Sequence, residues 1–391
     1  MTPRAHATGW RRTLDVFARL TVCVAGWSSI AAGAELRLVG AMPGTSSRVA
    51  ALSFDGARAA GYQRATGQPF FGFVWDEAHG RSDYIFPGGS PLLTAISSDG
   101  SVATGSGVVP SVTPGNALRV LAGGQFEDLG RPAGVSGTSA SEAISADGST
   151  IVGYFQNSTS SRTAFRWTPQ TGCVVLSSRG DGRTATGVSA DGRTIVGWTG
   201  YNLSLTRAFV WREGQGVSQL PWPSDYPSGS ASAYAHAISG DGRIIVGSSD
   251  GPEYNDALMW VDGIPQRIRG PEGWIAIGAY AVDHDGDTML VSGRRVGTTP
   301  FDPSTTLIMS AEYGFMEARE FLIAHGAVLP ETAQIQVTCL SGDGRSFGGS
   351  YFDPAVSPYG QGFVFTVPTP ASGVVGLAAC QWLARRCRAR A

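Results

Sequence analysis

Lysine is absent from this 391-residue sequence, and cysteine is scarce. All 29 basic residues are arginine, and only Cys173 and Cys339 of the five cysteines lie within residues 35–367. Two thiols so far apart in sequence predict neither a disulfide framework nor a metal cluster. Residues 35–367 also contain nine more acidic than basic side chains and no basic stripe. This balance argues against nucleic acids and anionic membrane surfaces as partners.

Signatures of catalysis are missing as well. The sequence contains no Gly-x-Ser-x-Gly elbow, phosphate-binding loop, His-Glu-x-x-His, Cys-x-x-Cys or dinucleotide-binding fingerprint. Its five histidines are isolated from one another. The 54 glycines follow no Gly-X-Y period, which excludes a collagen-like chain. The sequence therefore favours a protein that binds rather than catalyses, and an enzyme is the alternative.

A repeated phrase of twelve residues is the main feature that is present. It reads AISADGSTIVGY at 143–154, and close copies begin at Gly187 and Ala237. A small residue precedes each Asp-Gly pair by four positions and an aliphatic residue by three, and glycine follows the aspartate by six positions in six copies. The aspartates of the seven copies are Asp55, Asp99, Asp147, Asp191, Asp241, Asp285 and Asp343.

The phrase has the features of a β-hairpin. An Asp-Gly pair tolerates the positive φ angles of a type I′ turn, and short aliphatic and β-branched segments flank it. The glycine six residues later would weaken a strand interior. We therefore expect that glycine to mark a bulge or a close approach of two backbones.

Each copy continues with a second apolar run and, after a glycine-rich turn, a third. The second runs end mostly in aromatic residues, namely Trp75, Trp167, Trp211, Trp260 and Phe365. Four short strands in each period of 44 to 58 residues are typical of a β-propeller blade. Because one such sheet cannot bury both faces alone, we expect these aromatic side chains to fill the space between stacked blades.

The two ends of the repeat region predict a closed ring. Residues 36–40 resemble the fourth strand of a blade, and the last copy lacks this strand after Phe365. Residues 36–40 would thus complete the last blade and protect its open edge. Segment 316–331 has a helical apolar spacing and explains the long last interval. We predict an all-β, seven-bladed β-propeller of four-stranded antiparallel blades, closed by an N-terminal strand, with one short helix before the last blade.

Residues 1–34 have the composition of a signal peptide. Four arginines precede an apolar stretch from Leu20 to Ala34, which ends in Ala32-Gly33-Ala34, an A-x-A cleavage site before Glu35. A membrane-spanning helix would need about 20 apolar residues, and this stretch is shorter. We therefore expect an exported protein whose propeller occupies residues 35–367.

Residues 368–391 are organised like a sorting signal. Pro368-Thr369-Pro370 is followed by a short apolar stretch and then by an arginine cluster that includes Arg385 and Arg386. Basic residues after an apolar segment form a stop signal at a cytoplasmic face. This order resembles the PEP-CTERM tail of exported bacterial proteins, with Thr369 in place of the usual glutamate. The resemblance implies transient membrane anchoring and recognition by an exosortase-like sorting enzyme.

The repeated phrase, followed by motifs such as Ala-Phe-Val-Trp, resembles the HAF-type extracellular repeats of bacterial surface proteins. The resemblance covers residues 36–366, and it includes the short helix before the final repeat. It implies an extracellular or cell-surface location, and it implies no catalytic residues.

One acidic stretch matches the beginning of a calcium loop. Asp283, Asp285 and Asp287 follow the D-x-D-G-D spacing, in which carboxylate oxygens converge on one cation. Arg294 occupies the position of the closing glutamate, and Asp285-Gly286 is also the sixth copy of the repeated turn. Ca²⁺ is therefore the only cofactor that the sequence suggests, and an ordinary acidic turn is the alternative.

The widest insertion without strand character, residues 221–234, contains Trp222, Tyr226 and Tyr234 among proline, serine and glycine. Loops on rigid scaffolds often carry function, and aromatic side chains on a propeller rim can stack on sugar faces. We regard these three residues as candidate ligand-binding residues. The alternative is that Trp222 and Tyr234 pack back onto blade edges.

These observations predict an exported, monomeric propeller that binds a glycan, a matrix component or another surface protein through its rim loops. Its further partners would be the export machinery and the sorting enzyme. The alternative is a lyase or hydrolase of extracellular polysaccharide, with acidic side chains and an arginine at the central channel.

Overall fold

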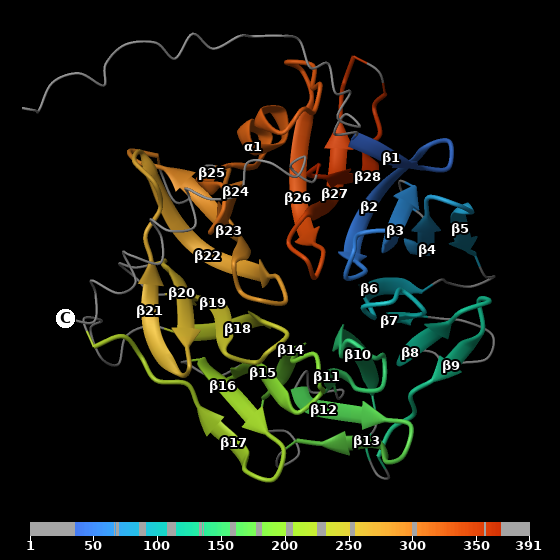
Figure 1. Ribbon diagram of the computed structural model, residues 1–391. Helices are drawn as coiled ribbons and strands as arrows, with labels where there is room; N and C mark the ends of the chain where they lie inside the picture. Colours follow the sequence, from blue (N-terminus) through green and yellow to red (C-terminus); the bar gives the residue numbers. More distant parts are fainter. Residues whose placement is uncertain are drawn as a thin grey trace, which may run out of the picture. The chain divides into compact units, whose positions relative to one another are not determined.

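The computed structural model describes residues 36–368 except for short stretches between elements. These stretches are 66, 68–69, 86–90, 108–114, 133–134, 136, 157–161, 177–181, 201–205, 225–231, 251–254, 299–302 and 356. The strands form seven four-stranded antiparallel sheets. The predicted seven-bladed β-propeller is confirmed, and the first strands of the blades surround a central channel (Figure 1).

The elements of the blades are as follows. Blade 1 contains β2 (Thr45–Leu52), β3 (Arg58–Ala65), β4 (Phe70–Asp76) and β5 (Gly80–Tyr84). Blade 2 contains β6 (Leu92–Ile96), β7 (Val102–Gly107), β8 (Asn116–Leu121) and β9 (Phe126–Asp128). Blade 3 contains β10 (Thr138–Ile144), β11 (Ile151–Gln156), β12 (Arg162–Thr168) and β13 (Gly172–Val175). Blade 4 contains β14 (Thr184–Val188), β15 (Thr194–Thr199), β16 (Arg207–Arg212) and β17 (Gly216–Gln219).

Blades 5 to 7 complete the ring. Blade 5 contains β18 (Ser232–Ile238), β19 (Ile244–Asp250), β20 (Ala257–Val261) and β21 (Ile264–Ile268). Blade 6 contains β22 (Trp274–Val282), β23 (Thr288–Arg295), β24 (Thr305–Ser310) and β25 (Gly314–Glu317). Blade 7 contains β26 (Gln334–Leu340), β27 (Ser346–Phe352), β28 (Gln361–Thr366) and, as its outer strand, β1 (Leu36–Gly40).

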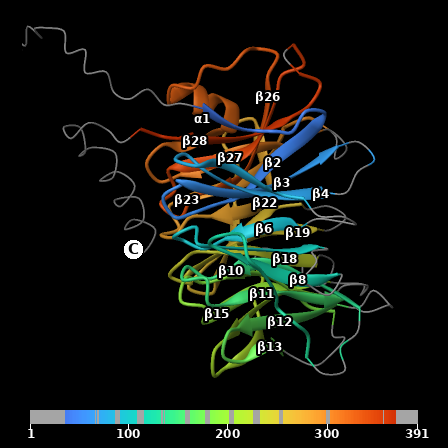
Figure 2. The same cartoon turned by 90° about the vertical axis from the view of Figure 1, so that its right-hand side faces the viewer.

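The N-terminal strand closes the ring as predicted. β1 pairs antiparallel with β28, and the register joins Leu36 to Phe365 and Leu38 to Phe363. The first strand of blade 1, β2, packs on β26 and β27 of blade 7. Seen edge-on, the sheets stack one on another (Figure 2). The seventh blade therefore leaves no open edge at β28.

The Asp-Gly turns are not of type I′, which corrects the sequence-based expectation. In the first turn, the N–H of Gly56 donates to the carbonyl of Ser53 (3.1 Å), and only the glycine has a positive φ, 71°. The Ser53 hydroxyl donates to the Asp55 carboxylate (2.8 Å) and accepts the N–H of Arg58 (3.0 Å). These side-chain hydrogen bonds hold the aspartate outside the left-handed region.

A ring of backbone hydrogen bonds connects the seven turns around the channel. The residue before each aspartate donates its N–H to the carbonyl of the corresponding residue in the next blade. The six bonds are Phe54 to Ser98, Ser98 to Ala146, Ala146 to Ala190, Ala190 to Gly240, Gly240 to His284 and His284 to Gly342, at 2.8–3.1 Å. The N–H of Asp343 donates to the carbonyl of Phe54 (2.9 Å) and closes the circle.

In the six copies that have it, the glycine six residues after the aspartate marks a close backbone approach, as expected. At Gly153 an added Cβ would lie 1.9 Å from the carbonyl oxygen of Ala140 on β10, and Gly247 has the same relation to Tyr234 on β18. The neighbouring residue of the first strand is bulged out of the pairing, for example Glu142 between Ser141 and Ala143. The glycine therefore admits a bulge that turns one side chain out of the sheet.

The aromatic residues that end the third strands lie between blades. Trp260 and Phe365 are 1% and 0% exposed, and Trp75 and Trp167 are also buried. Each of these four residues belongs to an apolar cluster that also contains residues of a neighbouring blade. Trp260, for example, lies in one cluster with Val196 of blade 4. The inter-blade core that the sequence predicts is thus present.

One helix, α1 (Ala318–Ala324), precedes the last blade, where the sequence predicts it. It buries Ala318, Phe321 and Leu322 against strands of blades 6 and 7, and it is shorter than segment 316–331 because the chain turns at Gly326 with φ of 101°. Across the described part of the chain, no helix is long and apolar enough to cross a membrane.

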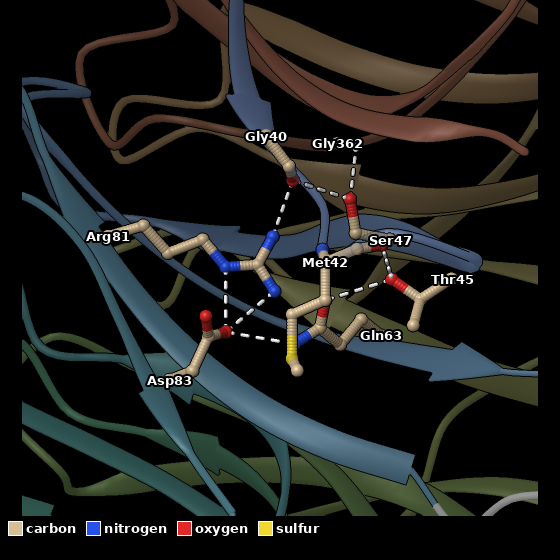
Figure 3. A network of polar contacts seen from close by, with 8 residues as sticks. All are labelled: Gly40, Met42, Thr45, Ser47, Gln63, Arg81, Asp83 and Gly362. Carbon is tan, nitrogen blue, oxygen red and sulfur yellow. Dashed lines mark hydrogen bonds and ion pairs between the residues drawn. The ribbon is translucent and has the colours of Figure 1, made fainter. Parts of the chain in front are cut away.

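A buried polar network fastens the closing strand (Figure 3). The Ser47 hydroxyl donates to the carbonyl of Gly40 at the end of β1 (2.9 Å) and accepts the N–H of Gly362 on β28 (2.8 Å). The Arg81 guanidinium also donates to the Gly40 carbonyl, and its Nε donates to Asp83 (2.8 Å). Blades 1 and 7 and the strand β1 are therefore joined through the Ser47 hydroxyl and the Arg81 guanidinium.

Replacing Ser47 by alanine should weaken this closure. The variant leaves the N–H of Gly362 without its buried partner, so we expect a loss of about 1–3 kcal/mol in the free energy of unfolding. The adjacent Ser46 is exposed, and Ser46→Ala should cost less than about 0.5 kcal/mol. Urea unfolding monitored by tryptophan fluorescence measures both values, and equal losses would contradict a special role for Ser47.

Candidate functional site

Two positions of each repeat lie near each other, at the end of the blade away from the Asp-Gly turn. The first position is the bulged residue of the first strand, five residues before the aspartate of the turn. The second position is on the second strand, seven residues after that aspartate. The bulged residues are Ala50, Thr94, Glu142, Thr186, His236, Tyr280 and Thr338. The second-strand residues are Tyr62, Ser106, Tyr154, Trp198, Ser248, Ser292 and Ser350. Both positions vary from blade to blade.

Blades 3 to 6 place a continuous series of rings at this end. The Arg162 guanidinium lies 3.9 Å from the Tyr154 ring centre and 5.9 Å from that of Trp198. Trp198 meets Tyr234 edge to face (5.6 Å), and Tyr234 stacks parallel to His236 (6.1 Å). His236 in turn lies 4.8 Å from Tyr280. We call Tyr154, Arg162, Trp198, Tyr234, His236 and Tyr280 the aromatic row.

A hollow of about 310 Å³ opens beside the row between blades 5 and 6. Its walls include Tyr234, His236 and Tyr280, and hydrogen-bonding groups are supplied by Ser248, Asp250 and Asn255, among others. The Tyr280 side chain is half exposed, at 50%. Aromatic faces with a few polar groups beside them are the usual surroundings of a small-molecule or sugar ligand.

His236 is a neutral member of the row. Burial lowers the pKa of His236 to about 4, so its imidazole carries no charge at neutral pH. One ring nitrogen lies 2.8 Å from the Ser248 hydroxyl. The ring therefore presents an uncharged face and a fixed orientation to the hollow.

Glu142 is the acidic group of this end of the channel. Burial raises the pKa of Glu142, and the nearby Arg162 guanidinium opposes that increase. A carboxyl group whose pKa is raised by burial holds its proton more readily than an exposed one and can then donate a hydrogen bond. Arg162 thus acts electrostatically on Glu142 and also lies over rings of the aromatic row.

The other end of the channel, inside the ring of turns, is narrow, and polar side chains such as Asp283, His284 and Ser341 lie among its aliphatic ones. A hollow of about 210 Å³ there is lined by the aliphatic residues that lie three before each aspartate, such as Leu52 and Ile238. The rings of Phe54 and His284 meet edge to face across it at 5.7 Å. A Cβ on Gly240 would lie 1.9 Å from the His284 ring, so glycine makes room for that side chain.

The structure separates the three aromatic residues that the sequence suggested as ligand-binding residues. Tyr234 lies in the aromatic row on β18. Trp222 packs against the apolar cluster between blades 4 and 5, which matches the alternative of a ring packed onto a blade edge. Tyr226 lies outside the described residues.

Asp283, Asp285 and Asp287 do not converge on one point. The Asp283 carboxylate is buried in the turn and accepts the N–H groups of Asp287 (2.8 Å) and Thr288 (3.0 Å), whereas Asp285 and Asp287 are exposed. Within the described ranges, no group of three His, Cys, Asp or Glu residues is placed to hold a metal ion. Asp283 instead occupies the position of the serine of the other six turns.

That exchange of serine for aspartate has a cost that depends on pH. Burial raises the pKa of Asp283 to about 6, above its ordinary value of 3.8. Burial favours the protonated form of Asp283 in the folded protein. The contribution of Asp283 to the free energy of unfolding is therefore fully present below pH 4 and is lost as the pH rises through about 6.

Asp283→Ser should consequently stabilise the protein at pH 7 by about 1–3 kcal/mol, with little difference from the parent at pH 4. The reciprocal change Ser239→Asp in blade 5 should destabilise it with the same pH dependence. Urea unfolding at pH 4 and pH 7 tests both variants. An Asp283→Ser protein that is less stable than the parent at pH 7 would contradict this account of the sixth turn.

The sorting residues fall at the edge of the described chain. The carbonyl of Pro368 accepts a hydrogen bond from Arg345 (3.4 Å), just beyond β28. Pro370, Arg385 and Arg386 lie outside the described residues, as do residues 1–35.

Sequence reasoning missed most of the aromatic row because its members come from four blades. Tyr154, Trp198 and Tyr280 are each separated by more than 40 positions, so they form no local motif. A signal was nevertheless present. The positions five before and seven after each aspartate change from Ala, Thr or Ser to Glu, His, Tyr or Trp within an otherwise regular phrase.

Comparison with known proteins adds the fold alone. No family model matches the chain, and no curated protein matches it. Among solved structures, the chain is similar to an oligogalacturonate lyase in complex with manganese, with 12% identity, a TM-score of 0.53 and coverage of 86% of this chain and 93% of that one. TolB from Acinetobacter baumannii is 12% identical with a TM-score of 0.43, covering 79% of this chain and 80% of that one.

Proposed function

We propose that this protein is an exported, non-catalytic β-propeller that binds a glycan at the aromatic row. The observation that carries the proposal is the alignment of Tyr154, Trp198, Tyr234 and Tyr280 on one end of four consecutive blades. Rings held by a rigid scaffold provide flat apolar surfaces without a large loss of side-chain entropy on binding. The C–H faces of sugar rings are complementary to such surfaces, and their hydroxyl groups suit Asp250 and Asn255.

The proposal places the site at the channel end and not at the loop 221–234 of the rim. Tyr234 alone of that loop belongs to the row, because it lies on β18. The opposite channel end also has hydrogen-bonding side chains, including Asp283 and His284, but its hollow is smaller, about 210 Å³ against about 310 Å³. Its rings are the single pair Phe54 and His284 among the described residues. Sugar binding needs extended ring surfaces together with polar groups, so the end with the aromatic row is favoured.

Trp198→Ala should remove a central ring of the site. We expect binding of the strongest ligand found on a glycan array to weaken at least tenfold, which corresponds to about 1.4 kcal/mol. Trp198→Phe should retain most of the affinity, and Tyr359→Ala, at an exposed ring outside the row, should retain all of it. Calorimetric titration measures the affinities, and circular dichroism checks that each variant is folded. Unchanged binding by Trp198→Ala would refute the proposed site.

A polysaccharide lyase or hydrolase is the second candidate, and Glu142 is the observation that favours it. A carboxyl group with a raised pKa is suited to proton transfer. A reducing-end assay on any bound glycan separates the two functions. Retention without new reducing ends supports binding. Release of ends that disappears in Glu142→Gln would establish the enzyme.

Export is supported by the order of segments along the chain. Cleavage after Ala34 would leave β1, which begins at Leu36, complete for ring closure. The PEP-CTERM-like tail begins directly after β28, so a sorting enzyme could remove it without touching a blade. We infer a cell-surface or extracellular location, with transient anchoring through the C-terminal segment.

Expression of the full chain in a Gram-negative host tests the first cleavage. The exported protein should begin at Glu35 when its N-terminus is sequenced. Ala34→Trp places a large side chain in the A-x-A site and should leave the precursor uncut. A parent protein that keeps residues 1–34 would contradict the signal-peptide assignment.

A further inference from the structure

We propose that the glycan is a linear, uncharged chain that continues from the aromatic row into a cleft between blades 6 and 7. This inference rests on the proposed function and specifies its ligand. Three observations carry it: the size and continuity of the cleft, the chemistry of its walls, and its unsatisfied hydroxyl and amide groups.

The cleft exists because blade 6 and the segment after it depart from the repeat. The helix α1 and its connection lengthen the last interval to 58 residues, and Phe321 and Leu322 fill the core between blades 6 and 7. β22 carries two bulges, at Ile277 and Tyr280, where the other first strands carry one. Beside this irregular strand lies a cleft of about 560 Å³.

The cleft connects with the neighbouring hollows. Tyr280 lines both the cleft and the hollow beside the aromatic row. At its other side, Ser350 and Phe352 line both the cleft and a hollow of about 440 Å³ between blades 7 and 1, where Arg64 lies over the Phe70 ring. The three hollows therefore follow one another around the channel end from blade 5 to blade 1. An arc of this kind suits a chain ligand better than a single compact one.

The walls of the cleft are polar but carry no charge among the described residues. Beside the two rings and a few aliphatic side chains, they consist of serine, threonine and glutamine: Ser292, Ser304, Thr305, Thr306, Gln334, Gln336, Thr338 and Ser350. An ionised uronate placed here would lose hydration without meeting a charged side chain on the cleft walls, because Arg48 beside Gln336 already donates to that residue and lines the next hollow. The nine excess acidic residues of residues 35–367 would also repel an anionic polymer. The chemistry favours neutral sugars.

Several of these polar groups are available to a ligand. Thr306 donates to the carbonyl of Val337, and Thr338 donates to that of Val49, both at 2.9 Å. Gln336 accepts a hydrogen bond from the Arg48 guanidinium through its side-chain oxygen. For the side chains of the other polar wall residues, the described part of the chain shows no hydrogen-bond partner. Ser292, Thr305 and Ser350 thus present hydroxyl groups to the cleft, as hydroxyl recognition requires.

Binding measurements with oligosaccharides of two lengths test this inference. The probes are hexasaccharides of the cello-, malto- and manno-series, the disaccharide of the series that binds best, and hexagalacturonate as the anionic probe. The double variant Ser292→Ala/Ser350→Ala should bind the neutral hexasaccharide about tenfold more weakly. It should bind the disaccharide as the parent does, because the short probe occupies the aromatic row alone. Hexagalacturonate should bind the parent at least tenfold more weakly than the neutral hexasaccharide.

The repeat supplies a matched control. Ser106 occupies in blade 2 the position that Ser292 and Ser350 occupy in blades 6 and 7, so Ser106→Ala should change neither affinity. Trp198→Ala should weaken both the hexasaccharide and the disaccharide. The inference fails, and the proposed function stands, if Trp198→Ala weakens binding of the hexasaccharide but the double serine variant does not. The same conclusion holds if hexagalacturonate binds the parent as tightly as the neutral hexasaccharide does. If no saccharide binds the parent protein, the proposed function itself fails.

Discussion

The circle of backbone hydrogen bonds at the turns is the constraint on which the propeller depends. Each turn donates one N–H to the next blade and receives one from the blade before, so no blade satisfies its turn alone. Because the bonds use only the backbone, the residue before each aspartate ranges from Gly240 to Phe54. The flanking serine, aspartate and glycine are repeated because their side-chain bonds and positive φ angle hold the turn in the shape that the circle needs.

The same constraint explains why one end of the channel is regular and the other is varied. The turns fix the register of the first two strands, and the glycine six residues later admits the carbonyl of the first strand, as Gly153 admits that of Ala140. The resulting bulge turns one residue out of each first strand. Neither this residue nor its neighbour on the second strand is needed for the hydrogen-bonded circle. Blade 2 uses Thr94 there to donate a hydrogen bond to the carbonyl of Ser141 in blade 3 (2.9 Å), whereas blade 5 places His236 in the aromatic row.

The period of the sequence was enough to predict the blades and their closure, because strand pattern and turn residues are local features. The pairing of residues 36–40 with β28 follows from counting strands, and the observed register, which pairs Leu38 with Phe363, confirms it. The turn type could not be derived from Asp-Gly alone, since the serine two residues earlier decides it. The aromatic row could not be predicted from the sequence for a different reason. Trp198 and Tyr234 are in contact only because blades 4 and 5 stack. A search for close motifs instead selected Asp283 and its neighbours, which the fold uses as a turn.

The two channel ends also bear on whether the protein binds or catalyses. The turn end is narrowed by aliphatic side chains and by Phe54 against His284, and its Asp283 carboxylate is engaged by backbone N–H groups of its own turn. The end with the aromatic row opens into the hollow beside Tyr280. There the histidine is held neutral by burial, and the buried carboxyl group of Glu142 lies beside Arg162 at the edge of the row. General acid–base hydrolysis of a glycoside uses a pair of carboxyl groups about the scissile bond. Glu142 and Asp250 are carboxyl groups near the row but come from blades 3 and 5, and the series of rings beside hydroxyl groups is what led us to propose retention of a sugar chain.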